Sequence, residues 1–195
     1  MNFTQTFKYL KNKTMKLLDY QKRAIKNRIY DQSVAFPYIL LGLCGEVSEL
    51  IEKMINYSGT RDCQRLLSKE VGDIYWYIAA WCEENQIDIN SIEKLNAVDK
   101  NNEQQIIFRL ILCSGEIAEI GKKALRDDFE ESISKNVFPE QKLSAININL
   151  SILLHLLKLV ENHYGIFRAD VLDQNIEKIE KRKQDNVIQG SGDER

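Results

Sequence analysis

The sequence contains few residues that break helices. Only two prolines, Pro37 and Pro139, and nine glycines occur in 195 residues. The apolar residues recur at intervals of three and four instead of alternating, which is typical of amphipathic helices and not of half-buried strands. These two features predict an all-α protein. The chain is long enough to bury a sizeable core as one domain or as two small ones.

The sequence also lacks a strong charge of either sign and a long uninterrupted apolar run. Its formal net charge is −2, and its lysines and arginines are scattered, so no basic patch suggests a nucleic-acid polymer as partner. The N-terminal residues MNFTQTFKYLKNK lack the hydrophobic core of a secretory signal. Polar residues interrupt the richest apolar stretch, 146–160, so we expect no bilayer-spanning segment; they are Asn147, Asn149, His155 and Lys158.

Cysteine and histidine are too few and too scattered to suggest a zinc site. The chain has four cysteines without CxxC spacing and only two histidines, His155 and His163, which lie in one apolar stretch and are expected to be structural. Three of the cysteines have apolar neighbours and are expected to be buried, reduced thiols. We therefore expect a cytoplasmic protein. The four cysteines are Cys44, Cys63, Cys82 and Cys113.

Two pairs of carboxylates are the most informative feature that is present. Glu46 and Glu49 lie in GEVSELIEK, and Glu70 and Asp73 lie in KEVGDIYWY, each pair spaced i, i+3 so that both acids share one helix face. Residues 57–59 (YSG) predict a turn between two antiparallel helices. Acids beside a buried apolar stripe are costly unless neutralised, so four of them together favour a divalent cation. The spacing alone leaves solvated helix faces as an equally open interpretation.

The order of these motifs resembles that of the MazG-type all-α nucleoside triphosphate pyrophosphohydrolases. Their signature is ExxE, a short gap and ExxD, as in LLGLCGEVSELIEK followed by KEVGDIYWYIAAW. Residues 17–24 (LLDYQKRA) resemble the opening helix of that family. Residues 175–183 (NIEKIEKRK), with the tail VIQGSGDER after them, resemble the closing segment of one branch. The resemblance implies a MazG-like helical bundle.

The resemblance also implies a chemistry for these residues. Mg²⁺, with Mn²⁺ as a substitute, would be held by Glu46, Glu49, Glu70 and Asp73. A water activated by the metal would attack the α-phosphorus of a nucleoside triphosphate and release pyrophosphate. The catalytic candidates that would orient or deprotonate this water are Glu49 and Glu46. The candidates for binding the substrate phosphates are Lys53, Asn175, Lys178 and Arg182.

An internal repeat predicts two copies of one helical unit. GEVSEL at 45–50 recurs as GEIAEI at 115–120, and an IEK segment follows each copy, at 92–94 and 176–178. We expect repeats at 1–103 and 104–195 that are fused into a pseudo-twofold version of a dimer. The second repeat would carry the NxxK segment and the GSGD tail.

The second repeat has lost half of its acids. Alignment of Gln86 with Gly165 places Asn149 where Glu70 stands and Ile152 where Asp73 stands. The second repeat is therefore expected to be degenerate as a metal site. Its remaining ExxE is expected to form surface ion pairs at helical spacing. The acids are Glu116 and Glu119, and the partners are Lys122 and Lys123.

These observations predict a magnesium-dependent enzyme that hydrolyses a nucleoside triphosphate to the monophosphate and pyrophosphate, and that cleans the nucleotide pool. Its single composite site would use acids of the first repeat and Asn175, Lys178 and Arg182 of the second, and we expect the protein to be a homo-oligomer, specifically a dimer. One alternative is a dUTPase or dCTPase type of specificity. Another is a non-catalytic helical module that binds a nucleotide or a protein.

Overall fold

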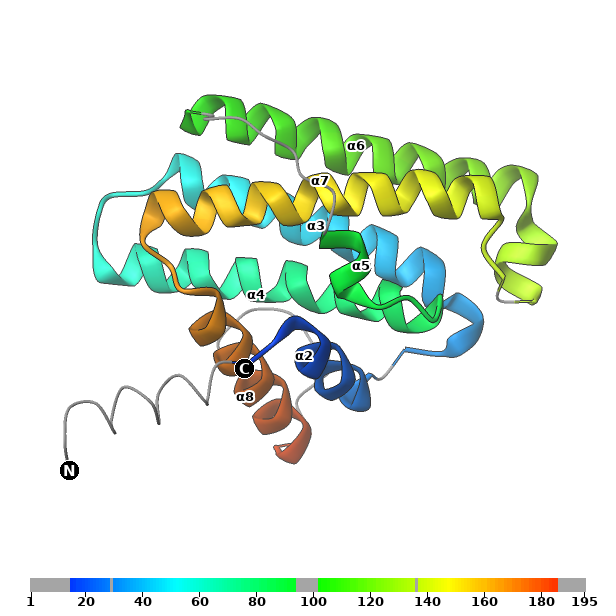
Figure 1. Cartoon of the computed structure of the whole chain (residues 1–195), viewed down its shortest axis with the longest axis horizontal. Helices are drawn as coiled ribbons and strands as arrows, with labels where there is room; N and C mark the ends of the chain where they lie inside the picture. Colours follow the sequence, from blue (N-terminus) through cyan, green and yellow to red (C-terminus); the bar gives the residue numbers. More distant parts are fainter. Residues whose placement is uncertain (1–14, 29, 94–101, 136, 186–195) are drawn as a thin grey trace.

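The computed structural model describes residues 15–28, 30–93, 102–135 and 137–185. Every regular element in these ranges is a helix, which confirms the predicted all-α class (Figure 1). The linker 94–101 and the tail 187–195, which includes the GSGD sequence, lie outside the described residues. The expected boundary between residues 103 and 104 falls at the first residue of a long helix.

Four long helices form the body of the molecule in two hairpins. The first hairpin consists of α3 (Ala35–Ile55) and α4 (Arg61–Glu84), and the second of α6 (Glu103–Asp127) and α7 (Glu140–Tyr164). Helix α3 packs against α6, which joins the hairpins into one body (Figure 1). The shorter elements are α2 (Leu17–Ala24), η1 (Ile25–Asn27), η2 (Gln32–Val34), α5 (Ile89–Glu93), the π-helical turn η3 (Glu130–Ser134) and α8 (Arg168–Gln184).

Local sequence signals explain where the long helices begin and turn. Gly59 has φ +77°, a left-handed conformation that glycine adopts readily, in the turn expected between α3 and α4. Thr60 caps α4 by accepting a hydrogen bond from the Cys63 amide at 3.2 Å. Helix α6 begins with a capping box, in which Asn102 and Gln105 exchange side chain to backbone hydrogen bonds.

The second helices of the two hairpins end in the same way. After α4, Gln86 has φ +56°, and the Ile87 amide donates to the Cys82 carbonyl at 2.7 Å. After α7, Gly165 has φ +65°, and the Ile166 amide makes the corresponding bond to Glu161 at 2.8 Å. A left-handed residue that closes a helix in this way is a common C-terminal cap. Gln86 and Gly165 are the residues that the sequence alignment pairs.

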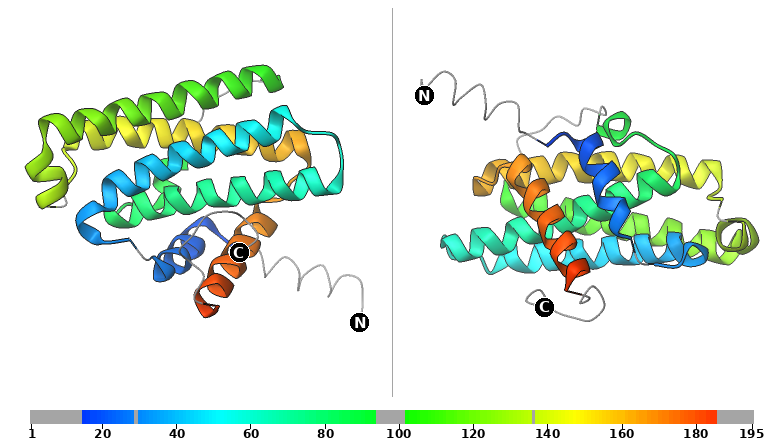
Figure 2. Two further views of the ribbon diagram at one scale, coloured as in Figure 1. Left: turned by 180° about the vertical axis from the view of Figure 1, so that it is seen from behind. Right: turned by 90° about the horizontal axis from the view of Figure 1, so that it is seen from below.

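The helix that follows each hairpin packs on the other hairpin. Helix α8 follows α7 but contacts α4, and α5 follows α4 but contacts α7. Seen from below, α2 and α8 lie side by side across the long helices (Figure 2). This exchange carries the NIEKIEKRK segment to the surface of α4, beside Asp73.

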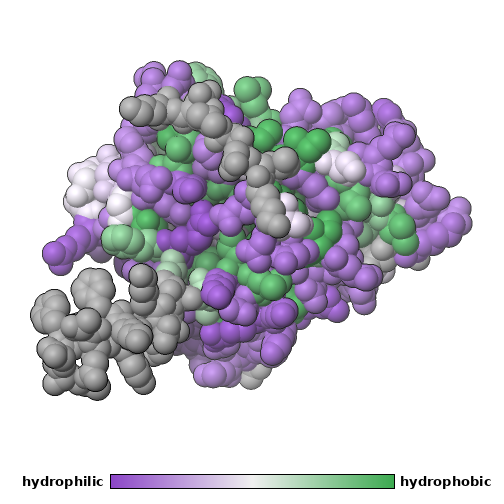
Figure 3. All heavy atoms as spheres, viewed as in Figure 1, coloured by the Kyte–Doolittle hydropathy of each residue, from purple (hydrophilic) through white to green (hydrophobic). Residues whose placement is uncertain are grey.

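The core runs through both hairpins, and the surface is mainly polar. Trp81, Tyr20 and Tyr75 are the largest fully buried side chains. On the face drawn in Figure 3, hydrophilic residues predominate and hydrophobic residues appear between them. Within the described residues, Gln32–Ile55 and Glu140–Tyr164 are long and apolar enough to cross a membrane by length and composition alone, a criterion that core helices of soluble proteins also meet. All four cysteines are free thiols.

Candidate metal centre

Three of the four predicted metal ligands come together between α3 and α4. Carboxylate oxygens of Glu46, Glu49 and Glu70 all lie within 4.8 Å of one another. Glu70 is only 1% exposed, Glu46 is half-buried and Glu49 is exposed, so the cluster runs from the helix interface to the solvent. The i, i+3 spacing on α3 directs both of its acids toward α4. A cation could enter this group of oxygens from the side of Glu49.

The electrostatics of the cluster disfavour a full set of negative charges. Burial, followed by the nearby carboxylates of Asp73, Glu49 and Glu70, raises the pKa of Glu46 to about 8, whereas Lys178 opposes the shift. Like charges close together disfavour ionisation, and an added cation removes that penalty. The three acids could hold a divalent cation, which would offset this repulsion.

The fourth predicted ligand, Asp73, is held by two residues of α8. Asn175 Nδ2 donates to Asp73 Oδ1 at 2.8 Å. Lys178 Nζ lies 2.6 Å from the same oxygen and also forms an ion pair with Oδ2. The structure thus brings acids of the first hairpin together with Asn175 and Lys178, which follow the second.

Tyr20 of α2 orients this arrangement, and the sequence interpretation did not include it. Its hydroxyl donates to Asn175 Oδ1 at 2.7 Å, which leaves the amide nitrogen facing Asp73. Gly72 allows α8 to approach, because a Cβ atom there would lie 3.1 Å from the Asn175 side chain. The sequence pattern identifies Tyr20 only as an apolar position of an amphipathic helix, and it does not predict the contact with Asn175.

Tyr77 lies near enough to Glu46 and Asp73 to feel their charge, which the sequence interpretation did not predict. Its ring lies over Gly42, where an added Cβ would come within 2.3 Å of ring atoms. Burial, then Tyr38, Glu46 and Asp73, raise the pKa of the Tyr77 hydroxyl well above its ordinary value. The signal available in the sequence was its place one turn after Asp73 on the same helix.

The remaining phosphate-binding candidates are less directly connected with the acids. Lys53 lies on α3 one turn beyond Glu49, and its Nζ is 3.8 Å from Glu52 Oε2. Arg182 is half-buried on α8, one turn beyond Lys178. Lys53 therefore shares α3 with two of the acids, whereas Arg182 shares α8 with Lys178.

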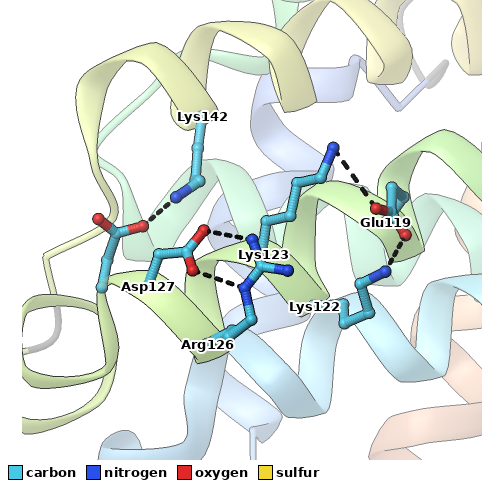
Figure 4. A network of polar contacts seen from close by, with 7 residues as sticks. Glu119, Lys122, Lys123, Arg126, Asp127 and Lys142 are labelled. Carbon is cyan, nitrogen blue, oxygen red and sulfur yellow. Dashed lines mark hydrogen bonds and ion pairs between the residues drawn. The ribbon is translucent and has the colours of Figure 1, made fainter.

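The second hairpin holds its acids in different surroundings. Glu119 forms ion pairs with Lys122 and with Lys123, the latter at 3.4 Å, as the sequence predicts (Figure 4). Glu116 is exposed. Arg126 and Asp127 form a further ion pair along the same helix (Figure 4).

The helix that faces these acids offers no carboxylate at the aligned positions. The Asn149 amide donates to the Ala145 carbonyl of its own helix at 3.0 Å. Ile152 packs against the hydrophobic core. Among the described residues, the only group of three metal-ligating side chains that share one small volume is therefore the cluster of the first hairpin.

Comparison of the chain with protein-family models, with curated proteins and with solved structures finds no match.

Proposed function

We propose that the protein is a magnesium-dependent nucleoside triphosphate pyrophosphohydrolase. The observation that carries this proposal is the meeting of Glu46, Glu49 and Glu70 between α3 and α4, beside an Asp73 that is contacted by Asn175 and Lys178. A hard divalent cation prefers such oxygen donors and commonly bridges them to substrate phosphates. The MazG-type resemblance of the motifs supports the same reaction, and cleaning of the nucleotide pool is the implied role.

The donor set fits Mg²⁺, with Mn²⁺ as a substitute. Carboxylates are the only side chains in the group, and burial together with the neighbouring carboxylates raises the pKa of Glu46. When bound, the metal would offset charge on phosphate oxygens and lower the pKa of a coordinated water. Glu46, Glu49 and Glu70 would hold it, with Asp73 completing the set. Glu49, the exposed member, is our candidate for orienting the attacking water.

Cations at the margin of the cluster would receive the phosphates. Lys178 is half-buried with its ammonium group already at the acids, and a triphosphate arriving there would meet its positive charge. Asn175 would keep Asp73 in place, since Tyr20 fixes the orientation of its amide. Lys53 and Arg182, on either side, would contact the leaving pyrophosphate.

The division of the site between the two hairpins suggests a duplicated unit. We propose that residues 1–103 and 104–195 are two MazG-like repeats that form a pseudo-dimer, of which the second has lost its facing acids. The equal helix-end geometry at Gln86 and Gly165 supports this interpretation. A further supporting contact is that of Cys44 Sγ with the Ser114 carbonyl at 3.3 Å, because the GEVSEL and GEIAEI motifs pair these two residues.

A panel of canonical and modified nucleoside triphosphates tests the activity. Each would be incubated with the full-length protein and Mg²⁺, and the products would be scored for pyrophosphate and orthophosphate. We expect pyrophosphate and a nucleoside monophosphate, and no turnover in EDTA. Preference for dUTP or dCTP would assign the corresponding specificity. Release of orthophosphate alone would contradict the proposed reaction.

A non-catalytic nucleotide-binding module is the second candidate. The observation that favours it is the ion pair of Asp73 with Lys178, which neutralises this acid without a metal. That module would bind triphosphates, as measured by calorimetry, without cleaving any member of the panel. Binding with turnover would reject it in favour of the enzyme.

A further inference from the structure

A cavity of about 230 Å³ lies away from the acids, at the other end of α3. The N-terminal half of α3, the C-terminal half of α6, the turn η3 and the segment that joins η3 to α7 line it, and it is partly open to solvent. Its walls are almost entirely apolar, so it is unsuited to a phosphate or a metal ion. The principal lining residues are Phe36, Leu40, Gly121, Ala124, Ser132 and Phe138.

Small residues of α6 line this space, and at Gly121 an added Cβ atom would lie 2.9 Å from Leu40 Cδ1. The alignment of GEVSEL with GEIAEI pairs Gly121 with Ile51 and Ala124 with Met54. In the first hairpin Met54 is 2% exposed and Ile51 packs against the core, so bulky side chains fill the corresponding region. The second hairpin is helical at these positions too, but its side chains there are small. The cavity is therefore a difference between two similarly built regions, not a general feature of the packing.

One polar group is buried in the wall of the cavity. Ser132 is 2% exposed, and its hydroxyl has no hydrogen-bond partner in the described part of the chain. A buried hydroxyl without a partner costs free energy, which a ligand with a complementary group would recover. Ser132 lies in the π-helical turn η3, and such turns occur frequently at functional sites.

We propose that this cavity binds a small apolar molecule that carries one hydroxyl or carbonyl group. An engineered apolar cavity of about 150 Å³ is known to take up benzene, so a volume of this size suits a substituted benzene or a bicyclic ring. The apolar walls would hold the ring, and the Ser132 hydroxyl would bond to the polar group. The site is separate from the proposed metal centre and does not depend on nucleotide hydrolysis.

The experiment compares two probes that differ by one hydroxyl. Binding of p-cresol and of toluene to the full-length protein would be measured by calorimetry and by the shift in Tm. We expect both to bind and p-cresol to bind more tightly. Ser132→Ala should weaken p-cresol binding about threefold to tenfold, the effect of one hydrogen bond, and change toluene binding less than twofold. Ser144→Ala, at an exposed position of α7, is the matched control and should change neither.

Filling the cavity tests its location. Ala124→Met introduces the residue that the first hairpin carries at the paired position, and it should abolish binding of both probes while Tm is kept or raised. Ala118→Leu, at the rim, is a second filling variant in case the first does not fold. Absence of binding by the unaltered protein, unchanged binding in the filled variants, or equal losses of both probes in Ser132→Ala would overturn the proposal. So would a filled variant that turns an oligomer into a monomer in sedimentation, because a partner side chain would then occupy the cavity.

Discussion

The two hairpins carry the same GExxE motif in opposite electrostatic surroundings. In α3, burial and three neighbouring carboxylates raise the pKa of Glu46 to about 8. In α6, the hydrogen bond from Lys122 and the nearby charge of Lys123 lower the pKa of Glu119. A motif of two acids on one helix thus has no fixed property of its own, and the residues packed around it decide whether it repels or attracts further negative charge.

The helix facing each motif explains the difference. Helix α4 places Glu70 beside the acids of α3 and Asp73 against α8, whereas α7 has Asn149 and Ile152 at the aligned positions. The Asn149 amide donates a hydrogen bond to a carbonyl of its own helix and carries no charge that a cation would have to neutralise. The facing helix is therefore one difference between the candidate metal centre and the solvated surface of α6.

The largest effect is expected from removing single acids of the first hairpin. Glu46→Gln, Glu49→Gln, Glu70→Gln and Asp73→Asn should each reduce magnesium-dependent turnover by about a hundredfold or more, because each removes a donor for the cation. Turnover would be measured as pyrophosphate release, and folding by circular dichroism.

The paired residues of the second hairpin provide the matched control. Glu116→Gln with Glu119→Gln should change turnover less than about twofold, since exposed ion pairs contribute little. If this double variant were as inactive as the variants of α3, the contrast between the hairpins would not be functional.

A smaller effect is expected at the contact between the hairpins. Lys178→Ala should lower turnover or triphosphate binding about tenfold to a hundredfold, the scale of a hydrogen bond between charged groups. Asn175→Ala should have a similar effect, because Asp73 loses a donor and the Tyr20 hydroxyl loses its acceptor. Lys181→Ala is the control, since Lys181 is exposed on the same helix. Equal activity of Lys178→Ala and Lys181→Ala would exclude a role for α8 in the site.

The helices and the pairing of acids were accessible from the sequence. Few breakers and three-to-four periodicity predicted the all-α class, and YSG predicted the turn in which Gly59 lies. The spacing of the acids is a local property, and the i, i+3 rule places them correctly on one helix face. The ion pairs of Glu119 follow from the same rule.

The residues that support the site were not accessible, because their contacts are long-range. Tyr20 meets Asn175 across more than 150 positions, a contact that depends on how α2 and α8 cross α4. Gly42 appears in the sequence as a weak helix former, yet its missing side chain is what admits the ring of Tyr77. Periodicity indicates that such residues are buried but not which neighbour they face.

The next-largest effect is expected in the pH dependence of the free energy of unfolding, which should differ between the acids of the two hairpins. The Glu46 carboxyl has an ordinary pKa near 4.5 and about 8 in the folded, metal-free protein. Between these values the folded state binds a proton that the unfolded state has released. The stabilisation of the folded state by the protonated Glu46 carboxyl is therefore fully present below about pH 4.5 and is lost as the pH rises to about 8. Urea unfolding in EDTA across this range should show the loss, amounting to a few kcal/mol at most.

Two comparisons isolate the contribution of Glu46. Glu46→Gln should flatten the pH dependence in this window, and the variant should exceed the unaltered protein in stability at pH 8. Glu119→Gln should leave the window unchanged, because the pKa of Glu119 is lowered and its linkage falls at more acidic pH. An identical pH profile for Glu46→Gln and the unaltered protein would show that Glu46 ionises normally.

The smallest effect is expected at the glycine that opens each GExxE motif. Gly45 and Gly115 are exposed within helices, and a Cβ atom at either would meet nothing within 4 Å. Because glycine in a helix is less stable than alanine, Gly45→Ala and Gly115→Ala should each raise the free energy of unfolding by about 0.5–1 kcal/mol. The corresponding rise in Tm is about 1–4 °C. Gly42→Ala should act in the opposite direction, since its Cβ would strike the ring of Tyr77. Equal gains in the free energy of unfolding for Gly45→Ala and Gly115→Ala would show that the two motifs differ in their neighbouring side chains and not in their helical backbones. A loss of stability in Gly45→Ala alone would instead place the difference in the backbone beside the acids.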